Sequence, residues 1–543
     1  MKKAFPRWAV CLFFAVFLAL GLLTAADYGP TWDESTEMDI LRMNLWEYAR
    51  VLNLDQSAFE ALAAREDPLA IETLRPISQS VEQDHGAAVF YPFSAVVLDL
   101  SLSGGTRSAL WHMACWTVFS LGGFALYVAL RQLGLSRGWS LLGPLFLLIS
   151  PRFFAQGHFN NKDIALFSLT LCALWQALAL AKKPGLLRGL CFALFGALAA
   201  NTKVAGLALW GLCALYVLVR LLMERRMTPR VWGVAGATAL SFGLFYALLT
   251  PAMWADPAGF FGYLLSNALS FQRWNGYVLF RGSVFDTASQ PLPWYYLPYM
   301  ILATTPLWAL LLCAVGTATA LWGGARRLQS GRAQGLSLLL AALLWLLPLA
   351  FAVVTRTRVY NGWRHFYFLY GPMLALAVLG AHTLYRRARG AKRRLLCALL
   401  GLCMALSAVG IVTQHPYQYA YYQPLVQLRG TGFNELDYWN VSARDALERL
   451  SGQEEGELVI EPADLWSAHA LSRAVAALPD DLAGRFTCLA EGSGARYVLS
   501  NPTYACFSGF APEADMAACV TLRAYGQPIM TIYERTTKEA DRP

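Results

Sequence analysis

The chain alternates long apolar stretches with short polar ones, and most of the apolar stretches have the length of a membrane-spanning helix. Crossing the hydrocarbon core of a bilayer takes about 20 apolar residues in a helix. Such a segment is expected to be helical because no water is present there to bond its backbone groups. Eleven stretches are nearly free of charge, and the third and fifth are short: residues 8–26, 108–130, 139–150, 164–181, 187–200, 204–222, 232–250, 295–323, 334–354, 366–385 and 394–413.

The amino-acid composition also indicates a membrane protein. The chain has 543 residues, of which 57% are hydrophobic and only 15% charged, too little charge for the surface of a soluble protein of this size. The first stretch follows Lys2, Lys3 and Arg7, as a signal peptide would. No convincing cleavage site leads into a soluble domain, and further spans follow, so it is expected to be a retained helix. We predict a polytopic α-helical membrane domain over residues 1–413.

The positive charges indicate the orientation. With a cytoplasmic N-terminus and alternating sides, every cytoplasmic segment carries basic residues, and together these segments contain one acid, Glu224. The opposite side receives the acid-rich first loop and short loops with few basic residues. This is the positive-inside pattern of a multi-pass protein of the plasma (inner) membrane. An odd number of spans places the tail, residues 414–543, outside the cytoplasm. The net charge of +9 is then explained by topology, and no nucleic-acid partner is expected.

The segments predicted to lie outside are the more varied ones. The first outer loop, residues 27–107, holds 14 acidic residues and five Arg, and residues 38–54 read as a helix with one apolar side, lying on the membrane surface. Further outer segments cover residues 150–163, 201–203, 251–294 and 355–366. The cytoplasmic loops are short, and no P-loop or Gly-rich dinucleotide motif occurs. Any chemistry is therefore expected on the outer face.

The tail has a soluble composition and is expected to form a small α/β domain. Residues 442–450 predict a helix with Ser442 as its N-cap, and residues 457–460, 496–499 and 530–533 predict strands. Three cysteines, Cys488, Cys506 and Cys519, leave room for one disulfide of unknown pairing. Residues 440–442 form a glycosylation sequon, which matters only in a eukaryotic secretory pathway. With no catalytic constellation visible, acceptor recognition or scaffolding is the expected role of the tail.

Several outer motifs occur in an order that resembles a known family. They are TWDE after the first span, SPRFF with HFNNKD in the second outer segment, ANTKVAG, PLPWYYLP, and RHFYFLYGP near the last spans. The set is similar to membrane glycosyltransferases of the GT-C fold, and more narrowly to bacterial relatives of the protein O-mannosyltransferases, glycosyltransferase family 39. The resemblance implies transfer of a sugar from a polyprenyl-phosphate carrier to an acceptor outside the cytoplasm.

Glycosyl transfer needs a base for the acceptor hydroxyl and positive charge for the departing phosphate. By position, Asp33 resembles the catalytic base of the family, and Glu34 a supporting residue. Either could instead cap the next helix. A single base without a covalent nucleophile favours inversion at the anomeric carbon.

Other candidates bind the donor or acceptor. Asp163 resembles the second acid of the family, with an N-cap as its alternative, and His158 could join it and Asp33 around a divalent metal ion. Lys203 and Arg364 are candidate phosphate ligands, the latter because its guanidinium offers a fork of donors. Lys203 could instead be a snorkelling topology residue.

A few outer residues complete the set of candidates. His365 is assigned to the same donor or acceptor site, and Arg356 and Arg358 lie close by. The outer aromatics are expected to anchor the chain at the membrane interface rather than to stack on sugars: Trp254, Trp274, Trp294 and Tyr295.

The main alternative function is a transporter or a flippase for lipid-linked glycans. A transporter is expected to show internal repeats and charged or broken helices near the middle of the membrane, and neither is evident. An inactive scaffold on a transferase fold is a third possibility. The sugar and the acceptor, whether protein, lipid or glycan, are not indicated.

Overall fold

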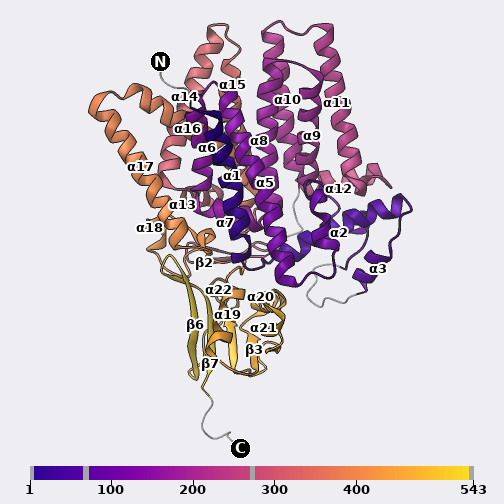
Figure 1. The fold of residues 1–543 in the computed structure, drawn as a ribbon, viewed down its shortest axis with the longest axis vertical. Coiled ribbons are helices and arrows are strands. Elements are labelled where there is room, and N and C mark those ends of the chain that lie inside the picture. The colour runs from indigo at the N-terminus through magenta and orange to yellow at the C-terminus, as the bar shows by residue number, and fades with distance from the viewer. Residues whose placement is uncertain (1–4, 65–72, 270–275, 537–543) are drawn as a thin grey trace, which may run out of the picture.

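A bundle of long helices carries a small domain at one of its ends (Figure 1). The computed structural model describes residues 5–64, 73–269 and 276–536. The turns α10–α11, α14–α15 and α16–α17 lie at the end far from the C-terminal domain (Figure 1). We call the end next to that domain the tail end of the bundle.

Within the described residues, nine helices are long and apolar enough to cross a membrane. Eight of them consist of one α-helix, in one case extended by a short 3-10 turn, and the ninth joins η5 (Arg364–Leu369) to α16 (Tyr370–Arg387). The eight are α1 (Arg7–Thr24, extended by η1, Ala25–Asp27), α5 (Gly104–Gln132), α8 (Asn161–Lys182), α10 (Val204–Met223), α11 (Pro229–Leu249), α14 (Leu307–Gln329), α15 (Gly335–Thr355) and α17 (Gly390–Thr413).

The prediction of about eleven spans was too high by this measure, and the two short stretches account for it. Residues 139–150 lie in α6 (Arg137–Leu148), which is bent by 72° against α7 (Pro151–Phe159) and makes a tenth span only if the pair counts as one. Residues 187–200 lie in α9 (Leu186–Thr202), which has 17 residues. The predicted span 295–323 is also broken, because Pro306 separates α13 (Tyr296–Thr304) from α14.

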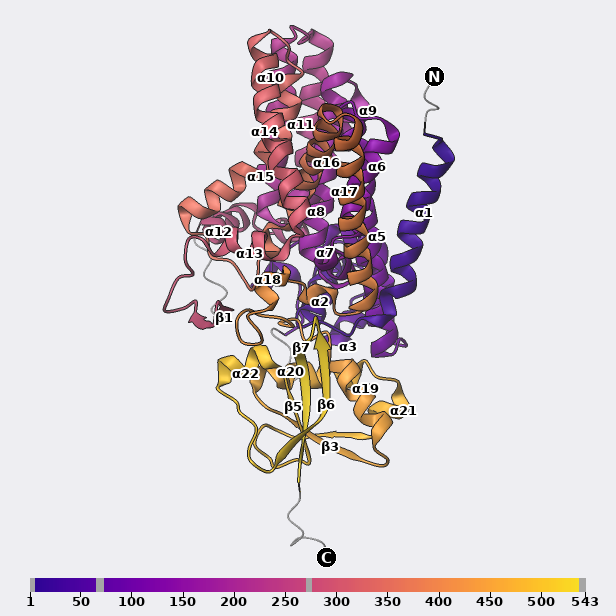
Figure 2. The ribbon, with the colours of Figure 1, turned by 90° about the vertical axis from the view of Figure 1, so that its left-hand side faces the viewer.

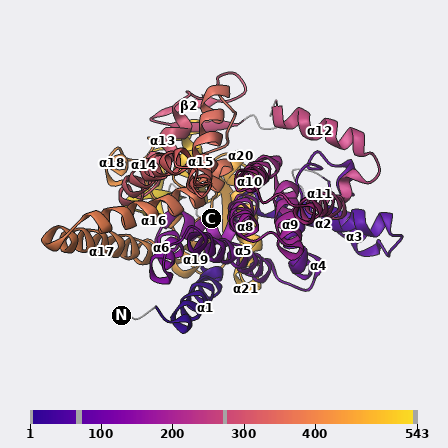
Figure 3. The ribbon, with the colours of Figure 1, turned by 90° about the horizontal axis from the view of Figure 1, so that it is seen from above.

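The helices differ strongly in how far they are buried in the protein. Of the apolar window of α8, 94% is buried, against 6% in α11 and in α17. Figure 3 shows α8 in the middle of the bundle, with α17 and α1 at its rim. Small residues allow close packing: a Cβ on Gly316 of α14 would lie 1.8 Å from the carbonyl oxygen of Leu376 in α16. The rim helices offer their apolar side chains to a bilayer.

Short elements form a layer across the tail end of the bundle. The predicted helix of the first loop is present and begins four residues earlier, as α2 (Glu34–Val51). One side of it is buried, including Met38 and Leu41. The other elements of the layer are α3 (Ser57–Ala63), η2 (Ile77–Gln79), η3 (Ala88–Phe93), α4 (Ser94–Leu98), η4 (Pro251–Met253), α12 (Pro257–Leu269), β1 (Tyr277–Phe280) and β2 (Ser283–Asp286).

The C-terminal domain is an α/β domain, as predicted. Its five-stranded sheet has the order β4-β3-β5-β7-β6, in which β3 runs parallel to β4 and β5, and β7 antiparallel to β5 and β6. All three predicted strands are present. The strands are β3 (Leu458–Pro462), β4 (Phe486–Cys488), β5 (Tyr497–Ser500), β6 (Met516–Ala524) and β7 (Gln527–Arg535). The helical elements of the tail are η6 (Gln418–Ala420), α18 (Pro424–Gln427), α19 (Ala443–Gln453), α20 (Leu465–Ala476), α21 (Asp480–Ala483) and α22 (Pro502–Ser508).

Details of the tail refine the sequence predictions. Ser442 does precede α19, but its hydroxyl donates to Asp437 at 2.5 Å instead of capping the helix. Asn440 of the sequon is buried and accepts a hydrogen bond from Asn501, so it offers no accessible amide for glycosylation. All three tail cysteines, within the part of the chain that the structure describes, are free thiols.

The tail packs directly against the bundle. Phe159 at the end of α7 and Tyr28 after α1 belong to the same apolar cluster as Tyr438 and Trp439 of the tail. Figure 2 shows α20 and α22 at the junction between the sheet and the bundle. This packing brings residues next to the early spans into contact with residues that follow the last span.

Candidate active site

The first turn of α2 and the start of η5 meet at the tail end through Asp33 and Arg364. The Nη1 of Arg364 donates to a carboxylate oxygen of Asp33. The Asp33 side chain keeps 27% of its surface exposed, whereas Arg364 keeps 10%. The predicted base is therefore held in place by a cation and can still be reached from solvent.

Aromatic rings hold the Arg364 guanidinium. The Cζ atom of Arg364 lies 4.6 Å from the ring centres of Tyr360 and Trp439 and 5.6 Å from that of Tyr438. Two of these rings come from the tail, so the tail helps to build the site. The Nε of Arg364 is buried without a hydrogen-bond partner in the described part of the chain. Cation–π contacts of this kind fix the plane of the guanidinium and leave donors for an anion.

Glu34 follows Asp33 in the chain but faces a different environment. Its side chain is 5% exposed, and its Oε2 lies 2.9 Å from the Nε2 of His112 in α5 and accepts a weaker bond from the Thr31 amide at 3.3 Å. The other ring nitrogen of His112 faces the Ala25 carbonyl at 3.0 Å. Glu34 thus ties the end of α1 and the start of α2 to α5. His112 was missed, although a histidine within an apolar span is itself a signal.

Asp163 and Lys203, predicted separately, form one ion pair. The Lys203 Nζ lies 2.5 Å from the Asp163 Oδ1, and the side chains are 17% and 4% exposed. Asp163 lies in the first turn of α8, where the helix dipole favours a carboxylate, and Lys203 is an extended residue between α9 and α10. The snorkelling alternative for Lys203 does not fit a partner at this distance.

A third ion pair, Lys162 with Glu37, lies near the other two, since the charge of Asp33 acts on Lys162 and that of Asp163 acts on Arg364. We call the three pairs the charged cluster: Asp33–Arg364, Asp163–Lys203 and Glu37–Lys162. The Lys162 Nζ lies 2.8 Å from the Glu37 Oε1 and 3.3 Å from the Nδ1 of His85, which in turn lies 2.5 Å from Glu82. None of these four residues was predicted to belong to the site. Their positions in the sequence could have indicated them. Lys162 directly precedes Asp163, and Glu37 follows Asp33 by one helical turn, so both acids lie on one face of α2.

His365 lies beside Tyr360, which also contacts Arg364. Its ring centre is 4.0 Å from that of Tyr360, and the charges of Lys203 and Arg364 act on it. Burial raises the pKa of Tyr360 to about 12, against the lowering effect of Arg364 and Lys162. Tyr360 is therefore a hydroxyl donor at neutral pH.

The metal site predicted from His158 and Asp163 is not formed. Residues 150–163 were expected to be an outer segment, but α7 occupies most of them and is buried throughout. The ring nitrogens of His158 lie 3.0 Å from the Phe154 carbonyl and 3.2 Å from the Gly21 carbonyl, and its ring stacks between Tyr28 and Trp116. Across the described residues, no group of three His, Cys, Asp or Glu side chains could hold a metal ion.

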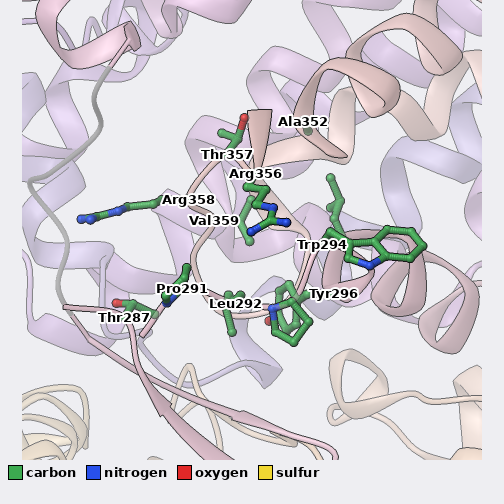
Figure 4. Close-up of a pocket in the computed structure, with 12 residues that line it drawn as sticks. Thr287, Pro291, Leu292, Trp294, Tyr296, Ala352, Arg356, Thr357, Arg358 and Val359 are labelled. Atoms are coloured by element: carbon green, nitrogen blue, oxygen red, sulfur yellow. The ribbon is translucent and has the colours of Figure 1, made fainter. Parts of the chain in front are cut away.

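The remaining outer cations lie elsewhere. Arg356 and Arg358 line a separate hollow with about 520 Å³ of empty space, together with Trp294 and Tyr296. Figure 4 shows the Arg356 guanidinium over this hollow and Arg358 extending away from it. No residue of the charged cluster lines it.

The predicted interfacial aromatics are partly accessible. Trp294 is 58% and Tyr295 37% exposed, while Trp254 is half-buried and donates to the Ala247 carbonyl at 2.6 Å. Trp274, and Arg273 before it, lie outside the described residues. Exposed aromatic rings next to apolar helices agree with an interfacial position.

The cluster as a whole can move a proton and bind an anion. Asp33 is a partly exposed carboxylate, and Arg364 and Lys203 supply positive charge within the same cluster. The Arg364, Asp163 and Lys203 side chains are largely buried, which strengthens their interactions relative to those of charges in water. No comparable set of charges is seen deep inside the described spans.

Comparisons with known proteins show likeness of fold. The structure is similar to that of ArnT from Cupriavidus metallidurans bound to undecaprenyl phosphate, with a TM-score of 0.49, 12% identity, and coverage of 99% of this chain and 100% of ArnT. For apo ArnT the TM-score is 0.47 and the identity 14%, over 96% of this chain and 97% of that one. For AglB from Archaeoglobus fulgidus in complex with an inhibitory peptide and a dolichol-phosphate, the TM-score is 0.46 and the identity 11%, over 99% of this chain and 75% of that one.

No protein-family model and no curated protein matches the sequence. The GT-C fold and the assignment to family 39 stay predictions from the sequence motifs. TM-scores below 0.5 at 11–14% identity do not decide a reaction. The function therefore has to be argued from the residues of the cluster.

Proposed function

We propose that this protein is a glycosyltransferase that moves a sugar from a polyprenyl-phosphate carrier to a hydroxyl of an acceptor, with Asp33 as the general base. The observation that carries the proposal is the pairing of a partly exposed Asp33 with Arg364, which is held by three aromatic rings. Base and anion ligand are the two groups that the reaction requires.

The proposed reaction is a direct displacement. Asp33 takes the proton of the acceptor hydroxyl as its oxygen bonds to the anomeric carbon of the sugar. The bond between that carbon and the phosphate oxygen breaks, and the carrier phosphate leaves with the electron pair. Arg364, through the donors that Asp33 does not use, and Lys203 stabilise this phosphate. One displacement inverts the anomeric configuration.

The other polar residues have supporting roles in this proposal. Asp163 orients Lys203 through their ion pair, and Glu34 holds the turn that carries Asp33. His365 and Tyr360 border the space in which the donor or acceptor would lie. In the described part of the chain, His158 and Asp163 do not come together with a third metal-ligating side chain, so no step is assigned to a divalent ion.

The proposal includes an orientation in the membrane. The tail end would face the extracytoplasmic side and the basic turns at the opposite end the cytoplasm, as the positive-inside pattern predicts. A transporter is the weaker alternative, because the ion pairs of the described residues lie near the two ends of the bundle instead of lining a path between them.

Radiolabelled sugar transfer in isolated membranes tests the proposal. Undecaprenyl phosphate carrying labelled mannose, glucose or an aminopentose serves as the donor, and the membranes supply the acceptors. We expect transfer from at least one donor by the wild type and its loss in Asp33→Asn. Asp27→Asn is the matched control, since Asp27 is a nearby carboxylate, 49% exposed and paired with His415 outside the cluster.

Three results would contradict the proposal. Equal transfer by wild type and Asp33→Asn would remove Asp33 from the role of base. Retention of the donor's anomeric configuration in the product would exclude a single displacement. Absence of transfer from every donor, together with net movement of a lipid-linked glycan across the membrane, would favour transport.

A further inference from the structure

A row of aromatic side chains leads away from Asp33 along the junction between bundle and tail. Trp32 lies 6.4 Å from Tyr504 of α22, ring centre to centre, and Tyr504 stacks at 5.9 Å on Trp466 of α20. Trp466 and Phe507 each lie within 5.8 Å of Tyr277 in β1. We call these five residues the aromatic wall. Three segments far apart in the sequence contribute to it.

Much of the wall is accessible. Tyr277 is 39% exposed, Trp32, Trp466 and Phe507 are half-buried, and Leu465 beside them is 64% exposed. The wall belongs to the tail domain and the adjoining loops, so the apolar helices of the bundle do not place it within a bilayer (Figure 2). An exposed apolar surface of this kind outside the membrane marks a binding site more often than chance.

The wall is continuous with the charged cluster. Trp32 immediately precedes Asp33, and its amide donates to the carbonyl of Trp439 at 3.1 Å. The guanidinium of Arg473, from the tail, lies 6.0 Å from the Trp32 ring and donates to the Thr31 carbonyl at 3.4 Å. A molecule lying on the wall would therefore extend to the Asp33 carboxylate.

The backbone beside the wall favours a glycan over an extended peptide. An extended peptide binds by adding a strand to an open sheet edge. In β1 one edge pairs with β2, and the other is already used: the Leu279 amide donates to Glu435, and the Tyr277 carbonyl accepts from Asn361. Of the remaining wall residues, Trp466, Tyr504 and Phe507 belong to helices, and Trp32 belongs to the turn before α2. The wall presents the faces of aromatic rings, which suit the apolar faces of pyranose rings. The polar groups of Arg473 and His469 lie at its edge.

We infer that the aromatic wall binds the carbohydrate part of the acceptor and presents its terminal hydroxyl to Asp33. This inference rests on the proposed function and adds the acceptor class to it. It also gives the tail domain a direct part in acceptor binding. Trp466 and Phe507 are the binding residues to test, because both are partly exposed and neither touches Asp33 or Arg364 in the structure.

Saturation-transfer NMR on the full chain in lipid nanodiscs tests the inference without requiring turnover. Nanodiscs avoid detergents with sugar headgroups, which would compete. The probes are mannotetraose, chitotetraose and a Ser/Thr-rich peptide. We expect transfer to at least one oligosaccharide and a decrease in its apparent affinity of about tenfold, or about 1.4 kcal/mol, in Trp466→Ala and in Phe507→Ala.

Matched variants separate binding from folding. Trp466→Tyr and Phe507→Tyr keep a ring and should retain most of the affinity, and Trp294→Ala removes a 58% exposed tryptophan outside the wall and should change nothing. Binding to the peptide alone, no transfer to either oligosaccharide, or unchanged affinity in both alanine variants would overturn the inference. Asp33→Asn distinguishes the two proposals, because it should lose sugar transfer while keeping oligosaccharide binding.

Discussion

Asp33 and Glu34 are neighbours in the chain, yet they lie in two different regions of the molecule. Asp33 lies at the open edge of the charged cluster with 27% of its side chain exposed, and Glu34 lies inside the bundle with 5% exposed. Their partners differ in the same way. Asp33 pairs with Arg364 at the start of η5, and Glu34 with His112 within α5.

The difference shows how two identical functional groups can have separate roles. Consecutive residues at the start of a helix point about 100° apart, so only one of two adjacent acids can face the open side. The buried acid is available for structure, and the exposed one for chemistry. The predictions below test this division, from the largest expected effect to the smallest.

The sharpest test compares Asp33→Asn with Glu34→Gln. Loss of a general base lowers the rate by about 10²–10⁴-fold, so sugar transfer by Asp33→Asn should fall within this range while its thermal unfolding is unchanged. Glu34→Gln keeps a hydrogen-bonding side chain of the same size, and its transfer rate should fall by less than about tenfold, since roughly 1 kcal/mol is involved. Equal losses in the two variants would remove the distinction.

The role of Glu34 is tested through its partner. His112→Leu leaves the buried Glu34 side chain without its hydrogen-bond partner on α5, and an unsatisfied buried polar group costs about 1–3 kcal/mol. We expect a decrease in the thermal unfolding temperature of the purified protein. The double variant with Glu34→Leu should recover part of that loss, because it removes the unsatisfied polar group. An unfolding temperature equal to that of the wild type would show that Glu34 does not depend on His112.

The partner of Asp33 is tested by Arg364→Lys. Lysine keeps the charge but lacks the planar fork that stacks between Tyr360 and Trp439. Losing one well-placed donor to a developing charge lowers the rate by about 10²-fold, and we expect a decrease of this order in sugar transfer. Arg356→Lys, in the separate hollow of Figure 4, is the control and should transfer at the wild-type rate.

The smallest expected effect concerns Glu435, which joins the tail to β1 and to the loop before Arg364. Burial raises its pKa from 4.5 to about 7, against the lowering effect of the Asn361 and Leu279 donors. The folded state therefore holds this proton more tightly than the unfolded state. The resulting stability is complete below pH 4.5 and is lost as the pH rises to about 7, by up to about 3 kcal/mol.

Glu435→Gln fixes the neutral form and measures this contribution. Its unfolding temperature should match the wild type near pH 4.5 and exceed it at pH 8. Glu457→Gln, an exposed acid of the same domain, should follow the wild type at both pH values. A variant that is less stable than the wild type at pH 8 would mean that the two N–H donors outweigh burial and that Glu435 is ionised.

Sequence reasoning located most of the cluster but not its pairs. Asp33, Glu34, Asp163, Lys203, Arg364 and His365 all lie at the tail end of the bundle, as their positions next to predicted spans indicated. The pairs join residues far apart, such as Asp33 and Arg364 at a separation of 331 residues. A local pattern carries no information on such a pairing, because it depends on which helices pack side by side.

The position of His158 was predicted wrongly from the sequence, because it lies in a buried helix and not in an outer loop. The run of residues 150–163 contains polar side chains and follows an apolar stretch, which is typical of a loop. Pro151 instead begins a buried helix, α7, and the imidazole fills a space between Tyr28 and Trp116. Burial of that kind follows from the bend of 72° between α6 and α7, which no periodicity indicates.

The sequence by itself determined the membrane class, most of the spans, the difference in charge between the two ends and the α/β nature of the tail. These properties depend on local composition and period, because a bilayer selects segments by length and polarity. Only the tertiary structure decided which acid is exposed, which cations they pair with, and that Tyr438 and Trp439 of the tail complete the site around Arg364. Those outcomes depend on side-chain packing between distant segments, which a linear pattern does not contain.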